Sequence, residues 1–287
     1  MAIGILKSSV QSLYILMLKD DRPLYSGTAI VVMSQYGPLL VTSRHLVTGR
    51  NQDNNRVLSP SREVPNQIKI AHNRRDELGE WVIREEKLYD ENGSPRWAEH
   101  PRLRGNANII ALPLQDVFDV EFFPYDLENT GPDLVVGLTD PVSIIGFPFG
   151  LRGGLSFPVW ANGFISSEPA VDQFDLPTFL IDCRSRPGQA GSAVVAHSNG
   201  GSMIMSGGEY KEISGPVTKL LGIFGGRLNN QSDLGIVWRL SAINEIVEGL
   251  GHSLSNEMRT EQSVGPGDEN HSTGNRLGGL FKRFRGS

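Results

Sequence analysis

The chain has 287 residues, of which 39% are hydrophobic and 21% are charged, and its formal net charge is -5. This length and hydrophobic content suffice for a packed core, in one large domain or two small ones. The mildly acidic balance gives no reason to expect a nucleic-acid partner, and we predict none. The 33 glycines and 17 prolines are spread along the chain, which favours many short strands joined by turns.

The cysteine content and the first residues bear on the cellular compartment. Cys183 is the single cysteine of the chain, so no intrachain disulfide can form. Because secreted domains commonly contain disulfides, we expect a cytoplasmic location. Polar residues between Ser8 and Ser12 interrupt any apolar run, and Leu13–Leu18 has only the length of a strand. The sequence therefore predicts neither a signal peptide nor a membrane span.

Short aliphatic segments separated by turn residues dominate the first half of the chain. Residues 50–65 are polar and rich in turn formers, and residues 124–132 contain turn residues without periodicity, so we expect a loop and a link between domains. The predicted strands of this half are Leu13–Leu18, Gly27–Met33, Pro38–Thr42, Gln67–Ala71, Glu80–Arg84 and Asn108–Leu114.

The second half repeats this spacing and ends in a predicted helix. Strands at such spacing favour an all-β barrel or sandwich over alternating strands and helices. In residues 241–250 the aliphatic side chains recur at helical spacing, with Ser241 as the expected cap and Gly249 or Gly251 as the expected end. The predicted strands of this half are Pro141–Gly146, Pro158–Ile165, Thr178–Asp182, Ser192–Ala196 and Lys219–Gly225.

Residues 253–287 are polar and poor in large apolar side chains, and we predict that they form a disordered tail. The tail ends in the basic and aromatic run Leu280–Arg285. A solvated, frayed terminus is the simpler interpretation of this run. The alternative is a docking peptide for a protein partner or an anionic surface.

Three segments carry residues suited to acyl-transfer chemistry. His45 follows a buried strand, which is the rigid mounting that a general base requires. Asn108 opens a second apolar strand. The turn Gly188–Ser192 contains two glycines, which allow close backbone approach and uncommon dihedral angles. Adjacent backbone N–H groups of such a turn can converge on a developing oxyanion.

These motifs and their order resemble those of the trypsin-like peptidase family, especially its disulfide-free bacterial branch. The histidine motif of the family resembles Thr42–His45, its acid motif resembles Asn108–Leu112, and its nucleophile motif resembles Gly188–Ala193. The order of base, acid and nucleophile along the chain is the order of this family. The segments Gly146–Pro148, Pro158–Ile165 and Leu220–Gly226 resemble strands of its second barrel, so the likeness covers roughly residues 12–250.

The resemblance implies an all-β fold of two six-stranded antiparallel β-barrels, with the active-site cleft between them and a C-terminal helix. We therefore expect an N-terminal barrel over residues 1–125, a C-terminal barrel with the helix over residues 126–252, and the tail over residues 253–287. The implied substrate is a peptide or a protein. We predict no cofactor, and no metal, because the remaining histidines have no ligand spacing with one another or with Cys183.

The resemblance also assigns roles to residues. His45, Asn108 and Ala190 occupy the catalytic positions, and the N–H groups of Gly188 and Ala190 would form the oxyanion hole. The substrate-binding strand would include Phe224, Gly225 and Gly226. Arg184 would lie near the floor of the primary pocket and favour acidic side chains, although a loop arginine directed to solvent is the simpler interpretation.

Two catalytic positions do not hold the usual residue. Ala190 replaces the nucleophilic serine, so no acyl-enzyme can form there. Asn108 replaces an aspartate and can hold a histidine in the wrong tautomer, although an asparagine can also orient a histidine. Ser192 is an improbable substitute nucleophile because it lies two residues further on. Asp116 and Asp119 are alternative acids on an expected loop.

These departures leave several interpretations open. The first is a serine endopeptidase whose nucleophile is absent in the chain as written, whether by engineering or in nature. The second is a natural pseudopeptidase that binds a peptide by strand addition. The third is an effector recruited through its basic tail. Gln189 occupies the place of the aspartate that receives a new N-terminus in digestive relatives, so we expect no activation by that route.

Overall fold

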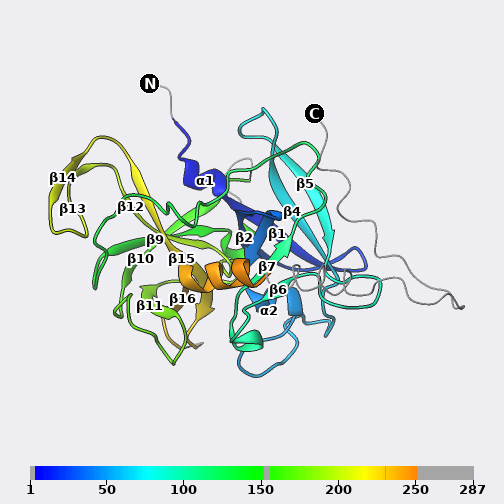
Figure 1. The fold of residues 1–287 in the computed structure, drawn as a ribbon. Helices are drawn as coiled ribbons and strands as arrows, with labels where there is room; N and C mark the ends of the chain where they lie inside the picture. Colours follow the sequence, from blue (N-terminus) through cyan, green and yellow to red (C-terminus); the bar gives the residue numbers. More distant parts are fainter. Residues whose placement is uncertain (1–3, 152–155, 230, 251–287) are drawn as a thin grey trace, which may run out of the picture. The chain divides into compact units, whose positions relative to one another are not determined.

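Strands dominate the computed structural model, which describes residues 4–151, 156–229 and 231–250. The predicted tail, including Leu280–Arg285, lies outside these residues, so its role as a docking peptide stays a prediction. No helix of the described ranges is both long enough and apolar enough to span a membrane. The all-β class is confirmed, and a helix over residues 240–250 ends the described chain (Figure 1).

The first half of the chain forms one antiparallel sheet of eight strands, in the order β5-β4-β1-β2-β3-β7-β6, with β8 paired to β4. Six strands are longer, and β6 and β8 have two residues each. The helix α1 (Lys7–Gln11) precedes the sheet and α2 (Arg44–Thr48) follows β3. The strands are β1 (Ser12–Lys19), β2 (Arg22–Ser34), β3 (Gly37–Thr42), β4 (Gln67–Arg74), β5 (Trp81–Lys87), β6 (Ala98–Glu99), β7 (Ile110–Pro113) and β8 (Val120–Glu121).

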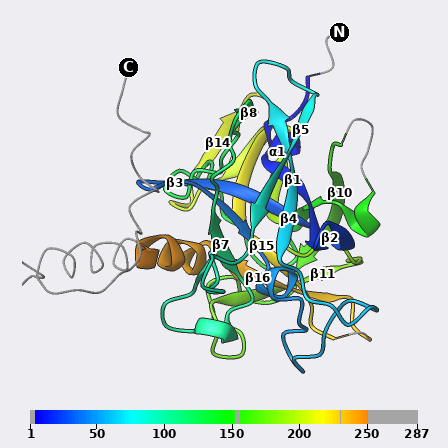
Figure 2. The ribbon, with the colours of Figure 1, turned by 90° about the vertical axis from the view of Figure 1, so that its right-hand side faces the viewer.

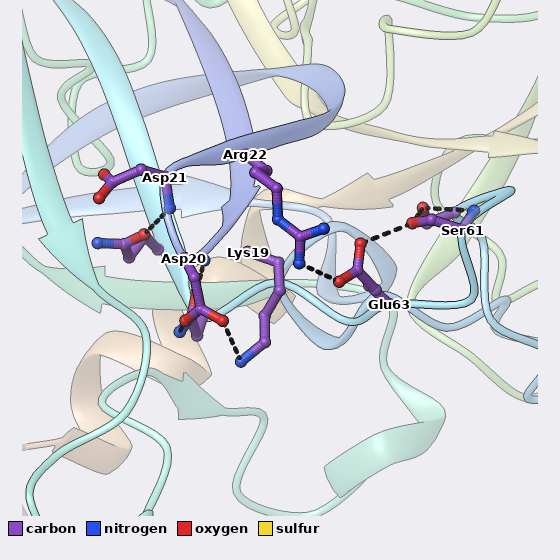
Figure 3. Close-up of polar contacts among 9 residues, drawn as sticks. Lys19, Asp20, Asp21, Arg22, Ser61 and Glu63 are labelled. Atoms are coloured by element: carbon purple, nitrogen blue, oxygen red, sulfur yellow. Dashed lines mark hydrogen bonds and ion pairs between the residues drawn. The ribbon is translucent and has the colours of Figure 1, made fainter.

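The turn between β1 and β2 shows how local chemistry shapes this sheet. Asp20 and Asp21 both have left-handed φ angles, of 48° and 63°, which suit the tight hairpin turns that match strand twist. Their backbone N–H groups donate to the side-chain oxygens of Asn66 and Gln67. Figure 3 shows this turn beside the ion pair of Arg22 with Glu63. The hydrogen bond from Asn66 is the main reason why the pKa of Asp20 is lowered.

The second half of the chain forms a closed barrel of six strands, in the order β10-β11-β16-β15-β12-β9. A separate two-stranded sheet, β13 (Gly201–Ile204) with β14 (Tyr210–Ile213), extends the connection from β12 to β15 (Figure 1). The short 3-10 turn η2 (Pro148–Gly150) follows β9. The barrel strands are β9 (Pro141–Gly146), β10 (Val159–Ile165), β11 (Thr178–Cys183), β12 (Ala193–Ser198), β15 (Val217–Arg227) and β16 (Leu234–Arg239).

One buried apolar cluster joins the two halves. It contains side chains of β2, β3, β9, β12 and β15 together with residues of the final helix, such as Ile30, Ile223 and Ile243. Figure 2 shows this helix beside β7 and β15. The helix starts at residue 240, so the predicted cap Ser241 lies inside it, and Gly249 does not end it. Strand β16 runs directly into the helix, which leaves no room for a separate cap.

Candidate active site

His45 lies just after the end of β3, at the boundary between the two halves of the chain. Ser43 has an extended conformation, and α2 begins at the next residue and ends at Gly49, which has a left-handed φ of 68°. The Thr42 hydroxyl donates to the carbonyl oxygen of Thr28 on β2, at 2.7 Å. The half-buried His45 is therefore carried by a strand end and a short helix that are both fixed by neighbouring backbone.

Asn108 lies against His45 and is held from both ends of its amide. Its Oδ1 accepts the backbone N–H of His45 at 3.0 Å and lies 3.0 Å from the Nδ1 of the same residue. Its Nδ2 donates to the carbonyl oxygen of Gly225 at 2.9 Å. Because a backbone N–H can only donate and a carbonyl can only accept, these contacts fix the orientation of the amide.

This orientation selects the tautomer of His45. Nδ1 faces an oxygen, so it carries the proton, and Nε2 keeps its lone pair. The wrong tautomer that an asparagine could impose does not arise, because Nδ2 is occupied by Gly225. Burial lowers the pKa of His45, although the hydrogen bond to Asn108 and the charge of Asp53 partly oppose this effect. The imidazole is therefore neutral at pH 7 and suited to accept a proton.

The turn that contains Ala190 is anchored through its carbonyl groups by one residue of β2. The Thr28 hydroxyl donates to the Gly188 carbonyl at 2.8 Å, and the Thr28 N–H donates to the Ala190 carbonyl at 3.0 Å. The Gly191 N–H donates to the Phe224 carbonyl at 2.8 Å. The methyl group of Ala190, partly buried, packs against the apolar core of the first half.

Both glycines of this turn are required by its geometry. Gly191 has a φ of 85°, and a Cβ there would lie 2.0 Å from the Thr28 carbonyl oxygen. Gly188 has a φ of 94°, and a Cβ there would lie 2.3 Å from the Phe147 carbonyl oxygen. Such distances are far below van der Waals contact, and left-handed φ angles already disfavour side chains.

The backbone N–H groups of Gly188 and Ala190 have no acceptor in the described part of the chain. Within residues 4–151, 156–229 and 231–250, neither of them donates a hydrogen bond. Both residues are half-buried, so these donors can be reached by solvent or by a ligand. A substrate carbonyl oxygen could accept both, as an oxyanion hole requires.

Strand β15 joins the three segments. The Phe224 carbonyl accepts the Gly191 N–H and lies 3.4 Å from the donating Ser43 hydroxyl, while the next carbonyl, of Gly225, accepts from Asn108. Two successive carbonyls thus connect the histidine segment, the nucleophile turn and the asparagine. The Phe224 ring itself is buried in the barrel core, so only its backbone belongs to the site.

The remaining predicted residues occupy the following places. Arg184 is exposed on the loop after β11, and Gly226 has a φ of 134° on β15, so their roles in substrate binding stay predictions. Ser192 is fully buried, and a Cβ on Gly146 would lie 1.9 Å from its hydroxyl oxygen. The Ser192 hydroxyl therefore faces β9 and not the cleft. The Gln189 side-chain oxygen accepts the Arg186 N–H, which gives Gln189 a local role in the turn.

The alternative acids lie away from His45. Asp116 forms an ion pair with Arg84, and Asp119 forms one with Arg74. Asn108 is thus the residue that contacts the histidine ring. No group of three or more His, Cys, Asp and Glu residues that could hold a metal ion occurs in the described part of the chain.

The sequence did not reveal the hydrogen bonds by which Thr28, Thr42 and Ser43 support the site. All three are fully buried and carry a hydroxyl group. A buried hydroxyl nearly always has a hydrogen-bond partner, so a threonine inside an apolar strand is a signal of a specific contact. Their partners lie in other segments, so the sequence pattern could not identify them.

The chain is similar to known peptidases in sequence and in fold. A family model described as "Trypsin-like peptidase domain" matches residues 27–203. No curated protein matches the chain. Among solved structures, the chain is similar to a serine endoprotease from Yersinia pestis at 14% identity and a TM-score of 0.49, covering 85% of this chain and 65% of that one. It is also similar to an inactive form of Rv3671c from M. tuberculosis H37Rv, a serine-to-alanine mutant, at 15% identity and a TM-score of 0.43, covering 85% and 88% of the two chains.

Proposed function

The chain belongs to the family of trypsin-like peptidase domains, and from this premise we propose that it has the cleft of a serine endopeptidase without the nucleophile. The general base is His45, the residue that orients it is Asn108, and the oxyanion donors are the N–H groups of Gly188 and Ala190. The chain as written does not cleave peptides by acyl-enzyme chemistry, because a methyl group has no lone pair and no proton to transfer. In subtilisin, loss of the nucleophile costs about six orders of magnitude in turnover.

The observation that carries this proposal is the orientation of the Asn108 amide. With Oδ1 toward His45 and Nδ2 bonded to Gly225, the histidine has its free lone pair on Nε2, the atom that a nucleophile would use. Asparagine serves as the orienting residue in cysteine peptidases of the papain type, so an amide is compatible with catalysis.

A second candidate function is a peptide-binding module. The two N–H groups that have no partner among the described residues, and the half-buried Gly226 on β15, do not depend on a hydroxyl at position 190. They support binding of a peptide carbonyl and of an extended peptide strand by the chain as written. The two candidates share one cleft and differ in what residue 190 contributes.

The experiment that tests the proposal is cleavage of a broad peptide library by the Ala190→Ser variant, read by mass spectrometry. We expect cleavage by this variant and none by the chain as written. The double variant Ala190→Ser with His45→Ala is the matched control and should be inactive. If the single variant remains folded and cuts nothing, the endopeptidase proposal fails. Binding of library peptides to the unchanged chain would then favour the binding module.

The cellular location and the partners are part of the same proposal. We propose a peptide or protein ligand, in line with the family. The cytoplasmic location stays a prediction that the single cysteine supports.

A further inference from the structure

The 3-10 turn η2 lies against the turn that carries the oxyanion donors. We propose that the hydrogen bond from the Phe149 N–H to the Pro187 carbonyl is the contact that directs the Gly188 N–H into the cleft. Phe149 would thus be a positioning residue, which acts through its backbone. This inference rests on the proposed function, because it concerns the same oxyanion site.

One peptide unit connects the Phe149 contact with the orientation of the Gly188 N–H. The Phe149 N–H donates to the Pro187 carbonyl oxygen over 2.6 Å. The carbonyl of Pro187 and the N–H of Gly188 belong to the same planar trans peptide, so they point in opposite directions. A bond that holds the carbonyl toward η2 therefore turns the Gly188 N–H away from η2. Rotation of this peptide would put a carbonyl oxygen where the donor should be.

The following peptide unit, between Gly188 and Gln189, is held as well. The Thr28 hydroxyl donates to the Gly188 carbonyl at 2.8 Å and accepts the Phe147 N–H at 3.1 Å. Gly188 is also tightly packed, since a Cβ there would lie 2.3 Å from the Phe147 carbonyl oxygen and 3.2 Å from the Phe149 nitrogen. Residues 147–149 and Thr28 thus fix Gly188 from both sides.

The backbone conformation of Phe149 is unusual for its residue type. It has a φ of 55° and a ψ of 20°, which is the left-handed region that a bulky residue seldom adopts. Its side chain is 63% exposed, so packing of the ring does not explain the conformation. The backbone of the turn is closed by bonds from Gly150 to Phe147 and from Leu151 to Pro148. An unusual conformation held in this way beside a reactive site is a common mark of a functional constraint.

The test removes the Phe149 N–H and keeps its side chain. In the Ala190→Ser protein, Phe149 is replaced by phenyllactic acid, which exchanges the amide for an ester. We expect kcat to fall about tenfold or more with KM unchanged, since one oxyanion donor is worth about 10² to 10³ in kcat. The matched control is the same amide-to-ester exchange at Val171, whose N–H donates to the Glu168 carbonyl in a turn that contains no residue of the site. The control should change kcat by no more than about twofold, which is far smaller than the change expected when an oxyanion donor is lost.

A crystal structure of the Phe149 ester variant supplies the second readout. The inference predicts that the Pro187–Gly188 peptide rotates, so that its carbonyl points into the cleft. An unchanged kcat, or a lower kcat with an unrotated peptide, would overturn it. If the Ala190→Ser parent cleaves nothing, the proposed function fails by itself, and the orientation of this peptide in the variant alone decides the inference.

Discussion

The side-chain amide of Asn108 donates to the Gly225 carbonyl oxygen at 2.9 Å, and this contact determines the tautomer of His45. It forces the amide oxygen toward His45, which places the proton on Nδ1 and the lone pair on Nε2. The Gly225 carbonyl on β15 accepts a hydrogen bond that an amide can donate and a carboxylate cannot. This position therefore favours asparagine over the usual aspartate.

We predict that Asn108→Asp destabilises the protein at neutral pH. A carboxylate oxygen would face the Gly225 carbonyl oxygen, and an unpaired buried group of this kind costs about 1–3 kcal/mol. The repulsion should raise the pKa of the new carboxyl group. A raised pKa in an acid means that the folded state binds the proton more readily, so the stability that the variant loses relative to its parent should shrink as the pH falls from 7 to 5.

Urea unfolding of the variant and its parent at both pH values checks this prediction. The control is Asn106→Asp, at an exposed position close in sequence, which should change stability little. If the Asn108→Asp protein is as stable as its parent at pH 7, the Gly225 carbonyl does not favour an amide over a carboxylate at position 108.

The pH dependence of the Ala190→Ser variant should reflect a histidine with a lowered pKa. Because His45 must be neutral to act as a base, kcat/KM should stay constant down to a pH below the ordinary value of 6.5 and then fall. Removing the opposing charge by Asp53→Asn should move this acid limb to still lower pH. An acid limb at or above pH 6.5 would contradict the assignment of burial as the dominant cause.

Substitution Gly191→Ala should prevent a stable fold or strongly destabilise it. The new Cβ would meet the Thr28 carbonyl at 2.0 Å, and the φ of 85° disfavours any side chain. We expect a loss of several kcal/mol, above the range of about 0.5–3 kcal/mol of most single substitutions. Thermal unfolding compares it with Gly137→Ala, where a Cβ meets nothing within 4 Å and which should be nearly neutral. If the two variants were equally stable, the close contact between Gly191 and the Thr28 carbonyl would be contradicted.

His72 should make stability depend on pH. It is buried beside Phe122, and burial lowers its pKa to about 4. The unfolded chain then binds a proton near pH 6.5, before the folded chain does, so stability present above pH 6.5 is lost between pH 6.5 and 4. The loss is about 3 kcal/mol, since each pKa unit corresponds to about 1.4 kcal/mol.

The variant His72→Leu isolates this contribution. Burial also lowers the pKa of His45 and His100, so both proteins should lose stability in acid, but the variant should lose less. The measurement is the free energy of unfolding in urea at pH 7, 6, 5 and 4. Parallel curves for the two proteins would mean that His72 is not protonated on unfolding.

Much of the fold could be predicted because aliphatic strands are local patterns. The prediction for β9 has the bounds that the structure gives, and β10 and β11 differ from their predictions by one residue. The sheet of β13 and β14 was missed because its strands have only four residues each and are mostly exposed, and it is defined by pairing between the two strands. The strand β16 was also missed, although it is apolar, because it runs directly into the helix.

The candidate site could also be predicted only in part from the sequence. The positions of His45, Asn108 and Ala190 follow from motifs, but the orientation of the Asn108 amide depends on Gly225, which is 117 residues away. The anchor of Gly188 depends on Thr28, 160 residues away. The helix α2, which carries His45, has five residues and is too short to show a helical period. Contacts of this kind are set by the packing of the two halves.

The central claim is that the site lacks only its nucleophile, and labelling of the Ala190→Ser variant by an alkyl fluorophosphonate tests it most directly. This probe phosphonylates a serine that has been activated by a base and an oxyanion hole, and it needs no knowledge of the natural substrate. We predict a mass increase of one phosphonyl group, mapped to residue 190, that is abolished by the additional change His45→Ala. A folded Ala190→Ser protein that remains unlabelled would contradict the account.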